Sequence, residues 1–214
     1  MELQRTFEWH EKRRGLFTAS SIHKLMGAKG LGQTGETYIL EKVTEALGVD
    51  LNEVSTIAMQ YGTDMEPQAK EYYKKCFNCQ ITESGFVVAN WCNEAGCSPD
   101  GIIESKNKLI EIKCPYNPVH HTQNLLIKSA DDLKKLRPEY YWQVQMQMAV
   151  MNFDKCDFVS YCPAFISQIN GKLSGINRMI AIEIQANEQD IILLKSRISE
   201  AVELKHKLLK QINL

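Results

Sequence analysis

The chain has little excess charge, no long apolar run, no internal repeat and no low-complexity segment. Its 25 lysines and arginines nearly balance 26 aspartates and glutamates, for a net charge of −1. Any nucleic-acid site must therefore be a local basic patch and not a property of the whole molecule. No apolar stretch approaches the roughly 20 residues of a membrane span, and the first residues do not read as a signal peptide. We therefore expect no membrane partner.

Length and cysteine usage also restrict the interpretation. A chain of 214 residues can bury one good core, so we expect a single domain over residues 1–214. Seven scattered cysteines, an odd number, indicate free thiols in a reducing interior. The pairs Cys76-x-x-Cys79 and Cys92-x4-Cys97 leave a zinc or iron–sulfur site open as an alternative. The loose second spacing, with no histidine beside it, favours free thiols.

The most specific pattern is Ser98-Pro99-Asp100-Gly101, followed ten residues later by Ile110-Glu111-Ile112-Lys113. The residues between these motifs predict a β-hairpin, with a strand at 102–103, a turn at 105–108 and a returning strand at 109–112. The two motifs are therefore expected to lie side by side at one end of this hairpin.

The predicted hairpin brings three charged side chains to one face. A turn centred between residues 106 and 107 places Lys113 opposite Asp100 and Glu111 on the diagonal from Asp100. Side chains alternate between the two faces of a strand, so all three then share a face. The backbone separation of the two acidic residues is at most about 7–8 Å, which one divalent ion can bridge.

This arrangement indicates phosphodiester cleavage. Carboxylate oxygens suit Mg²⁺, which lowers the pKa of a bound water and neutralises charge on a phosphate. Lys113 is placed to hold the attacking hydroxide or to contact the phosphate. The alternative is an ordinary hairpin with exposed charges, since Glu-x-Lys alone is common. The correctly spaced Ser-Pro-Asp-Gly favours the metal site, as do Ile110 and Ile112, which point from the opposite face of the strand into a core.

The rest of the chain reads as a mixed α/β pattern. We expect the helix at 57–76 to be interrupted by Gly62 and Pro67, and Ser129 and Asn187 to begin later helices. The apolar stripe of the last helix predicts core packing or a subunit contact. Helices are expected near residues 20–26, 37–47, 57–76, 129–137, 138–151 and 187–212, and strands at 81–88, 155–162 and 179–184.

The helix expected at 138–151 carries Gln143, Gln145 and Gln147. Gln143 and Gln147 share a face because they are four residues apart. Glutamines on a surface helix are usually just solvated. Because this helix follows the predicted metal-binding hairpin, one of them is a candidate to contact the hydrolytic water or a phosphate.

Several motifs occur in one order along the chain: Trp9-His10-x-x-Arg13-x-Gly15-x-x-Thr18-Ala19-Ser20, Met59-Gln60-x-Gly62-x-x-x-Glu66, Ser98-Pro99-Asp100-Gly101, Glu111-Ile112-Lys113-Cys114-Pro115 and Gln143-Val144-Gln145. Together they resemble the phage lambda exonuclease family of viral recombination nucleases, within the PD-(D/E)xK superfamily. The resemblance covers about Trp9 to Met151. It implies an α/β, restriction-endonuclease-like core with a central mixed β-sheet flanked by helices.

The resemblance also implies roles for individual residues around Mg²⁺, for which Mn²⁺ can substitute. Asp100 and Glu111 would be metal ligands, with the Ile112 carbonyl completing the inner shell. Lys113 would be the catalytic lysine beside the hydrolytic water. The remaining implied site residues are Glu66, which would position a second ion through water, Gln143, which would contact the same water, and Arg13, Ser20 and Ser98, which would bind a terminal 5′-phosphate.

Members of this family work on double-stranded DNA ends. The resemblance implies a homotrimeric ring that digests one strand of the duplex from its 5′ end and leaves a 3′ overhang. Such enzymes commonly work with a single-strand annealing protein. The corresponding location is the cytoplasm of a bacterium or a phage-infected cell. Two other functions stay open: a RecB-like or Cas4-like nuclease with a cysteine-bound cluster, and a DNA-end-binding module without catalysis.

The proposed phosphate residues also make physical sense by themselves. Arg13 can donate two hydrogen bonds to phosphate oxygens, and Ser20 near a helix start adds a hydroxyl. The alternative is a basic surface with Ser20 as a plain helix cap. Arg14, a second arginine beside the first, departs from the motif and leaves open which of the two binds phosphate. We leave His10 out of the site, because a structural histidine explains it equally well.

Overall fold

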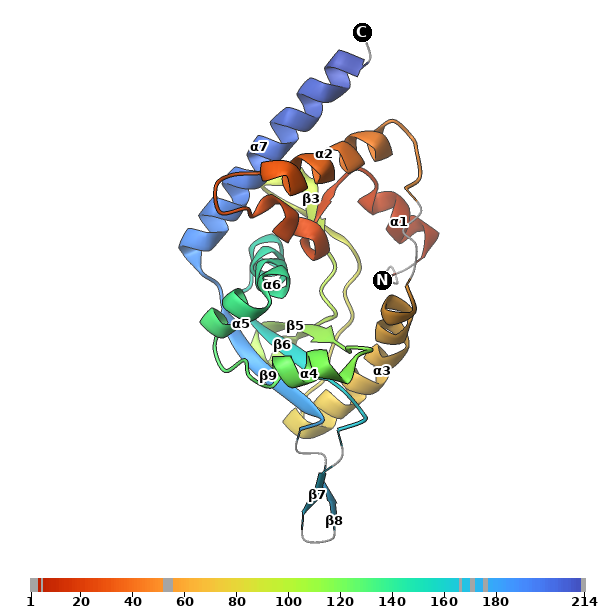
Figure 1. Ribbon diagram of the computed structural model, residues 1–214, viewed down its shortest axis with the longest axis vertical. Helices are drawn as coiled ribbons and strands as arrows, with labels where there is room; N and C mark the ends of the chain where they lie inside the picture. Colours follow the sequence, from red (N-terminus) through yellow and green to blue (C-terminus); the bar gives the residue numbers. More distant parts are fainter. Residues whose placement is uncertain are drawn as a thin grey trace.

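Figure 1 shows the computed structural model of the chain, which describes residues 4, 6–51, 56–165, 167–169, 172–174 and 177–212. Two mixed β-sheets are flanked by helices, so the expected α/β class is confirmed. The larger sheet has the order β4-β5-β6-β9 and the smaller β1-β3-β2, where a single central sheet was expected. The strands are β1 (Phe17–Thr18), β2 (Val87–Ala89), β3 (Cys92–Cys97), β4 (Gly101–Ile103), β5 (Lys108–Lys113), β6 (Lys155–Tyr161), β7 (Ser167–Ile169), β8 (Lys172–Ser174) and β9 (Met179–Gln185).

The helices connect and cover the sheets. In Figure 1, α6 occupies the middle of the molecule, α3 flanks the larger sheet, and the β7–β8 hairpin projects from the lower end. None of the described helices combines the length and apolarity needed to cross a membrane. The helices are α1 (Phe7–Arg13), the 3-10 helix η1 (Ala19–Leu25), α2 (Gly32–Ala46), α3 (Ile57–Phe77), the short 3-10 turn η2 (Glu104–Lys106), α4 (Pro118–Asn124), α5 (Ala130–Leu136), α6 (Pro138–Met151) and α7 (Glu188–Ile212).

The central strands β5 and β6 run parallel and are almost wholly buried. One face of their sheet packs on α3, where Ala69 and Tyr73 meet Ile110 and Val159. The other face lies under α6, which also contacts β2 and β3 of the smaller sheet. Helix α6 is therefore enclosed between the two sheets and is buried on nearly all sides, including its three glutamines.

Several expected boundaries are confirmed. Helix α6 begins at Pro138 and ends at Met151. The Ser129 side chain accepts a hydrogen bond from the Asp132 backbone N–H at the start of α5. Asn187 likewise accepts one from the Asp190 backbone N–H at the start of α7. The caps at Ser129 and Asn187 are local signals, since each depends on a hydrogen bond between residues three apart.

Two expectations about local structure are wrong. Helix α3 runs without a break through Gly62 and Pro67, because packing of its buried side on the sheet outweighs the local cost of those residues. The strand expected at 81–88 is reduced to β2, which starts at Val87, and an isolated bridge between Thr82 and Ile102.

The apolar stripe of α7 packs inside the molecule. Leu194, Ile198 and Ala201 are fully buried in the main core, whereas Ile212 near the end of the helix is exposed. Helix α7 lies along α2, as Figure 1 also shows. The larger part of this stripe is therefore core.

Candidate active site

The hairpin that carries the acidic residues forms with a different register from the one expected. Gly101 pairs with Ile110, so continuing the ladder by one residue sets Asp100 directly opposite Glu111 and not on its diagonal. The cause is the loop, in which the turn η2 is followed by Asn107 in the left-handed conformation. The register moves by two residues, and a shift of two keeps every side chain on its face. The predicted sharing of one face is therefore confirmed.

Glu111 is the centre of a buried contact network under α6. Its Oε1 atom accepts hydrogen bonds from Lys113 Nζ at 2.6 Å and from Gln143 Nε2 at 2.7 Å. Its Oε2 atom accepts one from Gln147 Nε2 at 2.6 Å. Lys113 Nζ also donates to Gln143 Oε1 at 3.0 Å. The strand and the helix therefore hold this carboxylate in one orientation.

Asp100 lies at the open end of the hairpin, where its Oδ2 accepts a hydrogen bond from the Ile112 backbone N–H at 2.6 Å. In a strand the N–H and C=O of one residue point to the same edge, so the Ile112 carbonyl also points toward the side of Asp100. Burial raises the pKa of Asp100 well above its usual value, and the nearby carboxylates of Glu111 and Glu66 raise it further.

These residues fit a divalent cation. Two carboxylates and a strand carbonyl are hard oxygen donors of the kind that Mg²⁺ takes. Burial and the carboxylates of Glu111 and Glu66 raise the pKa of Asp100, and a cation bound between the carboxylates would favour their ionised form. Gln147 Oε1 is buried with no hydrogen-bond partner among the described residues, so it can accept a hydrogen bond from a water on such an ion.

Lys113 keeps its proton in this setting. Burial alone would lower its pKa, but the carboxylates of Glu111 and Asp100 raise the pKa above the usual value of a lysine. Its ammonium group also lies 4.9 Å from the centroid of the Tyr140 ring. Lys113 is thus a fixed positive charge at neutral pH and can stabilise an anion, but it does not accept a proton.

Glu66 comes to the site from α3, on the far side of the hairpin. Its carboxylate pairs with Lys70 Nζ at 2.9 Å, one turn along the helix. It is close enough to raise the pKa of Asp100. Glu66 is therefore a neighbour of the acidic pair.

Gln147 belongs to this network, whereas the sequence offered it only as one of several candidate glutamines and the resemblance assigned a role to Gln143 alone. Its spacing of four residues from Gln143 was the available signal, and the sequence did not reveal that both glutamines would be buried. Gln145, on another face, instead donates to the Gln185 carbonyl at 2.9 Å and accepts from the Asn187 backbone N–H at 2.8 Å. Gln143 and Gln147 therefore contact Glu111 in the site, whereas Gln145 contacts backbone groups outside it.

The predicted phosphate residues Arg13 and Ser98 meet through Trp9. The Arg13 guanidinium lies 3.8 Å from the centroid of the Trp9 ring, and Trp9 Nε1 donates to Ser98 Oγ at 2.9 Å. Ser98 is two residues before Asp100, so this cluster adjoins the acidic pair along the chain. Arg14, in contrast, pairs with Glu11 at 2.5 Å.

Ser20 reaches the same region by a different route. Strand β1 runs parallel to β3 with Thr18 beside Gly96. Ser20 and Ser98 each lie two residues beyond the Thr18–Gly96 pair and past the end of their strands, so both leave the small sheet at the same end. Ser20 is exposed, and its Oγ lies 3.3 Å from Thr18 Oγ1. The structure therefore brings Ser20 to the end of the sheet that carries Ser98, with Thr18 as its described partner.

The two cysteine pairs do not form an evident cluster. Cys79 is buried, Cys76 is exposed, and the described cysteines carry free thiols. Within the described ranges, no group of three or more His, Cys, Asp or Glu side chains is arranged to hold a metal ion. The candidate cation site instead combines two carboxylates with a backbone carbonyl.

Comparison with known proteins decides the family. The model of the YqaJ-like viral recombinase domain matches residues 8–154. The chain belongs to this family. The matched range almost coincides with the resemblance over residues 9–151, so the predicted relationship to recombination nucleases of the lambda exonuclease type is confirmed.

Several solved structures are similar to this chain. An alkaline exonuclease from Laribacter hongkongensis, LHK-Exo, has a TM-score of 0.81 and 27% identity, with 97% of this chain and 96% of that chain covered. A complex of LHK-Exo with dAMP gives a TM-score of 0.80, 29% identity and the same coverage. A phage-related exonuclease from Haemophilus somnus shares the fold, with a TM-score of 0.73, 20% identity and coverage of 92% and 96%.

A curated sequence relative is longer than this chain. The uncharacterized protein R354 of Acanthamoeba polyphaga mimivirus is 24% identical over 213 residues, which include 88% of this chain. This chain spans only 36% of the length of that protein.

Proposed function

We propose that this YqaJ-like domain is a Mg²⁺-dependent exonuclease that digests one strand of duplex DNA from its 5′-phosphorylated end, processively, and leaves a 3′ overhang. The observation that carries the proposal is the convergence of Asp100, Glu111 and Lys113 on one face of the hairpin, within contact of Gln143. The likeness to LHK-Exo, which is named an alkaline exonuclease, supports the same chemistry.

The residues divide the chemical work. Asp100, Glu111 and the Ile112 carbonyl would hold a Mg²⁺ ion, which when bound would supply an activated water and neutralise charge on the scissile phosphate. Lys113, which stays protonated, would orient the attacking oxygen or the phosphate by charge. Gln143 fixes the position of Lys113 relative to Glu111. Glu66 would help to position a second ion.

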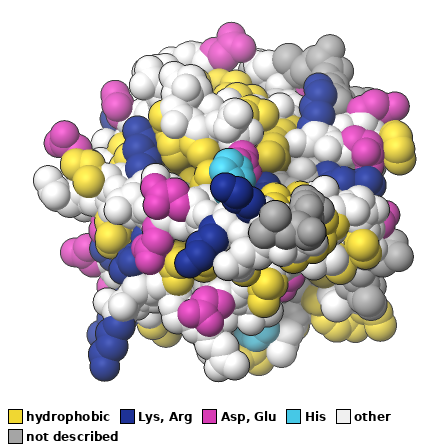
Figure 2. Space-filling model, turned by 90° about the horizontal axis from the view of Figure 1, so that it is seen from above, with side chains coloured by type: hydrophobic (Ala, Val, Ile, Leu, Met, Phe, Trp, Pro, Cys, Tyr) yellow, Lys and Arg dark blue, Asp and Glu magenta, His cyan; other side chains and the backbone are white. Residues whose placement is uncertain are grey.

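The substrate end is held by the cluster of Arg13, Ser98 and Ser20. Stacking on Trp9 fixes the plane of the Arg13 guanidinium, which favours two parallel hydrogen bonds to a terminal phosphate. On the face seen in Figure 2, basic and acidic side chains are interspersed with apolar ones. With a net charge of −1, DNA binding then depends on local contacts such as this cluster.

The biological setting follows from the product. A 3′ single-stranded overhang is the substrate of a single-strand annealing protein, which we propose as partner for recombination. Processive digestion requires the enzyme to stay attached to its product, and a ring of three copies around the DNA would achieve this. A monomer mass by light scattering at micromolar concentration would remove the homotrimer from the proposal.

The direct test uses linear duplex DNA with a 5′-phosphate and a different fluorescent label on each strand. In Mg²⁺ or Mn²⁺ we expect stepwise loss of the 5′-phosphorylated strand and survival of its complement as single-stranded DNA. In EDTA no cleavage is expected. Digestion from the 3′ end, internal cutting, or binding of ends without cleavage would each overturn the proposed activity.

A further inference from the structure

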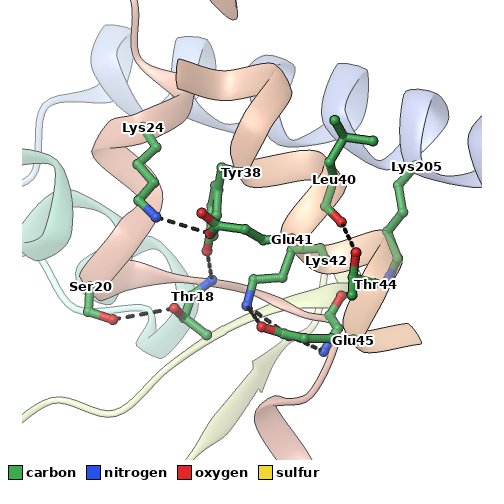
Figure 3. A network of polar contacts seen from close by, with 11 residues as sticks. Thr18, Ser20, Lys24, Tyr38, Leu40, Glu41, Lys42, Thr44, Glu45 and Lys205 are labelled. Atoms are coloured by element: carbon green, nitrogen blue, oxygen red, sulfur yellow. Dashed lines mark hydrogen bonds and ion pairs between the residues drawn. The ribbon is translucent and has the colours of Figure 1, made fainter. Parts of the chain in front are cut away.

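The backbone of Gly15 is held on both sides by charged side chains from distant parts of the chain. Its N–H donates to Glu45 Oε2 at 2.7 Å, and its carbonyl accepts from Lys205 Nζ at 2.8 Å. In Figure 3, Lys205 reaches from α7 toward the part of α2 that carries Glu45. Lys205 and Gly15 are 190 positions apart in sequence. This double contact therefore joins the C-terminal helix to the segment just after α1.

Both charged groups are themselves paired and largely buried. Lys205 Nζ contacts Glu94 Oε2 at 2.5 Å, and only 6% of the lysine side chain is exposed. Glu45 accepts two hydrogen bonds from Lys42 Nζ, at 2.8 and 2.9 Å. Glu94 also contacts the ring of His206. Buried ion pairs generally add little stability over apolar packing of the same volume, so stability alone does not account for this arrangement.

Gly15 is the joint between α1, which ends with Arg13, and β1, which leads into the segment that carries Ser20. Arg13, two residues before it, ends α1, while β1 begins two residues after it. The φ angle of Gly15 is +72°, a conformation that lets the chain turn sharply here. Because β1 pairs with β3, the orientation of this joint sets the position of Arg13 relative to Ser98 at the end of β3.

We infer that Lys205 and Glu45 are positioning residues for the terminal-phosphate pocket, acting through the Gly15 peptide on Arg13. This inference rests on the proposed function, because it assigns a purpose to a contact with the residue that would bind the phosphate. Lys205 does not touch the substrate. Its effect is to keep the Arg13 guanidinium where it can reach the terminal phosphate while Trp9 contacts Ser98.

The test is the ratio of digestion rates on 5′-phosphate and 5′-hydroxyl duplex ends, with KM and kcat for each. Lys205→Met should lower this ratio by between about fivefold and 100-fold, the range expected when a binding group is displaced by a fraction of an ångström to an ångström. The rate on hydroxyl ends should change little. Lys205→Arg, which keeps a donor and a charge, should restore most of the ratio.

The matched control is Lys108→Met. Lys108 is also a buried lysine in an ion pair, 2.7 Å from Asp157, but it lies on the α3 side of the sheet, away from Gly15. The Lys108→Met variant should keep the wild-type ratio of rates on phosphate and hydroxyl ends, even if its thermal stability falls. If Lys205→Met does not fold, Glu45→Gln tests the same joint from the N–H side and should lower the ratio in the same direction.

The outcomes separate the inference from the proposed function. A wild-type enzyme with no preference for phosphate ends contradicts the phosphate pocket, and the inference falls with it. A wild-type preference that Arg13→Ala removes but folded Lys205→Met and Glu45→Gln both keep contradicts the inference alone. A loss of the ratio in Lys108→Met equal to that in Lys205→Met would also overturn it, because the effect would then be general destabilisation.

Discussion

Gln147 Nε2 donates to Glu111 Oε2 at 2.6 Å, one helical turn from Gln143, which donates to the other oxygen of the same carboxylate. Helix α6 therefore holds both oxygens of Glu111, and the orientation of this proposed metal ligand depends on two amide side chains.

Replacement of Gln147 by leucine should weaken the site without removing a ligand. Partners that orient a metal ligand typically contribute 10–100-fold in metal affinity or activity, so we expect the Mg²⁺ concentration for half-maximal cleavage to rise by about that factor. Gln145→Leu is the matched control. It breaks scaffold contacts to Gln185 and Asn187 and should lower the melting temperature while leaving the Mg²⁺ dependence in place.

Lys113→Met should lower turnover by roughly tenfold to 100-fold while the protein still binds metal and DNA. In the proposed mechanism the ammonium acts in the chemical step as a fixed charge, and the lost charge-assisted contact is worth about 1.5–3 kcal/mol. Single-turnover kinetics measure this loss, and calorimetry measures metal binding. If the variant binds no metal, Lys113 instead supports the site structurally.

The sequence predicted those parts of the site that depend on local interactions. That Asp100, Glu111 and Lys113 share a face follows from strand alternation, and it survives a register error of two residues. The ends of α6 and the caps at Ser129 and Asn187 are equally local, and they were predicted correctly.

What the sequence could not predict arises from packing between distant segments. The pairing register of the hairpin depends on the left-handed conformation of Asn107 in the loop. The alternation of side chains along a strand does not reveal that register. The burial of Gln147 depends on α6 lying between two sheets. The contact of Lys205 with Gly15 joins opposite ends of the chain. In α3, packing against the sheet outweighed the breaking tendency of Pro67.

Arg13→Ala should remove most of the preference for phosphorylated ends. A bidentate contact of a guanidinium with phosphate is worth about 1.5–3 kcal/mol, or roughly a tenfold to 100-fold rate effect if it is realised in the transition state. The rate on phosphate ends should fall to near that on hydroxyl ends. Arg14→Ala is the matched control, because Arg14 pairs with Glu11. Equal losses on both substrates would make Arg13 a general DNA contact.

His121 should make the fold sensitive to acid. It is fully buried, with Nδ1 2.8 Å from Ser160 Oγ and Nε2 2.8 Å from the Asn177 carbonyl. Burial lowers its pKa below the ordinary 6.5, partly offset by the Asn177 carbonyl. The unfolded chain then binds a proton at higher pH than the folded protein, so stability is full above about pH 6.5 and falls as the pH drops below it.

Urea unfolding of the metal-free protein between pH 5 and 8 measures this effect. His121→Gln should unfold more easily at pH 8 but lose less stability toward pH 5 than the wild type. His120→Gln, at the exposed neighbouring position, should keep the wild-type pH dependence. A wild-type slope in His121→Gln would show that other groups cause the acid sensitivity.

The most direct measurement of the central claim is the rate of nucleotide release from 5′-phosphorylated linear duplex DNA as a function of Mg²⁺, for the wild type and for Asp100→Asn. If Asp100 and Glu111 together hold the ion that activates water, as proposed, the wild-type rate should saturate with Mg²⁺ and vanish in EDTA. The variant should fold yet fall by at least about 100-fold at every Mg²⁺ concentration. Wild-type cleavage in EDTA, or an Asp100→Asn variant that cleaves at the wild-type rate, would contradict the account.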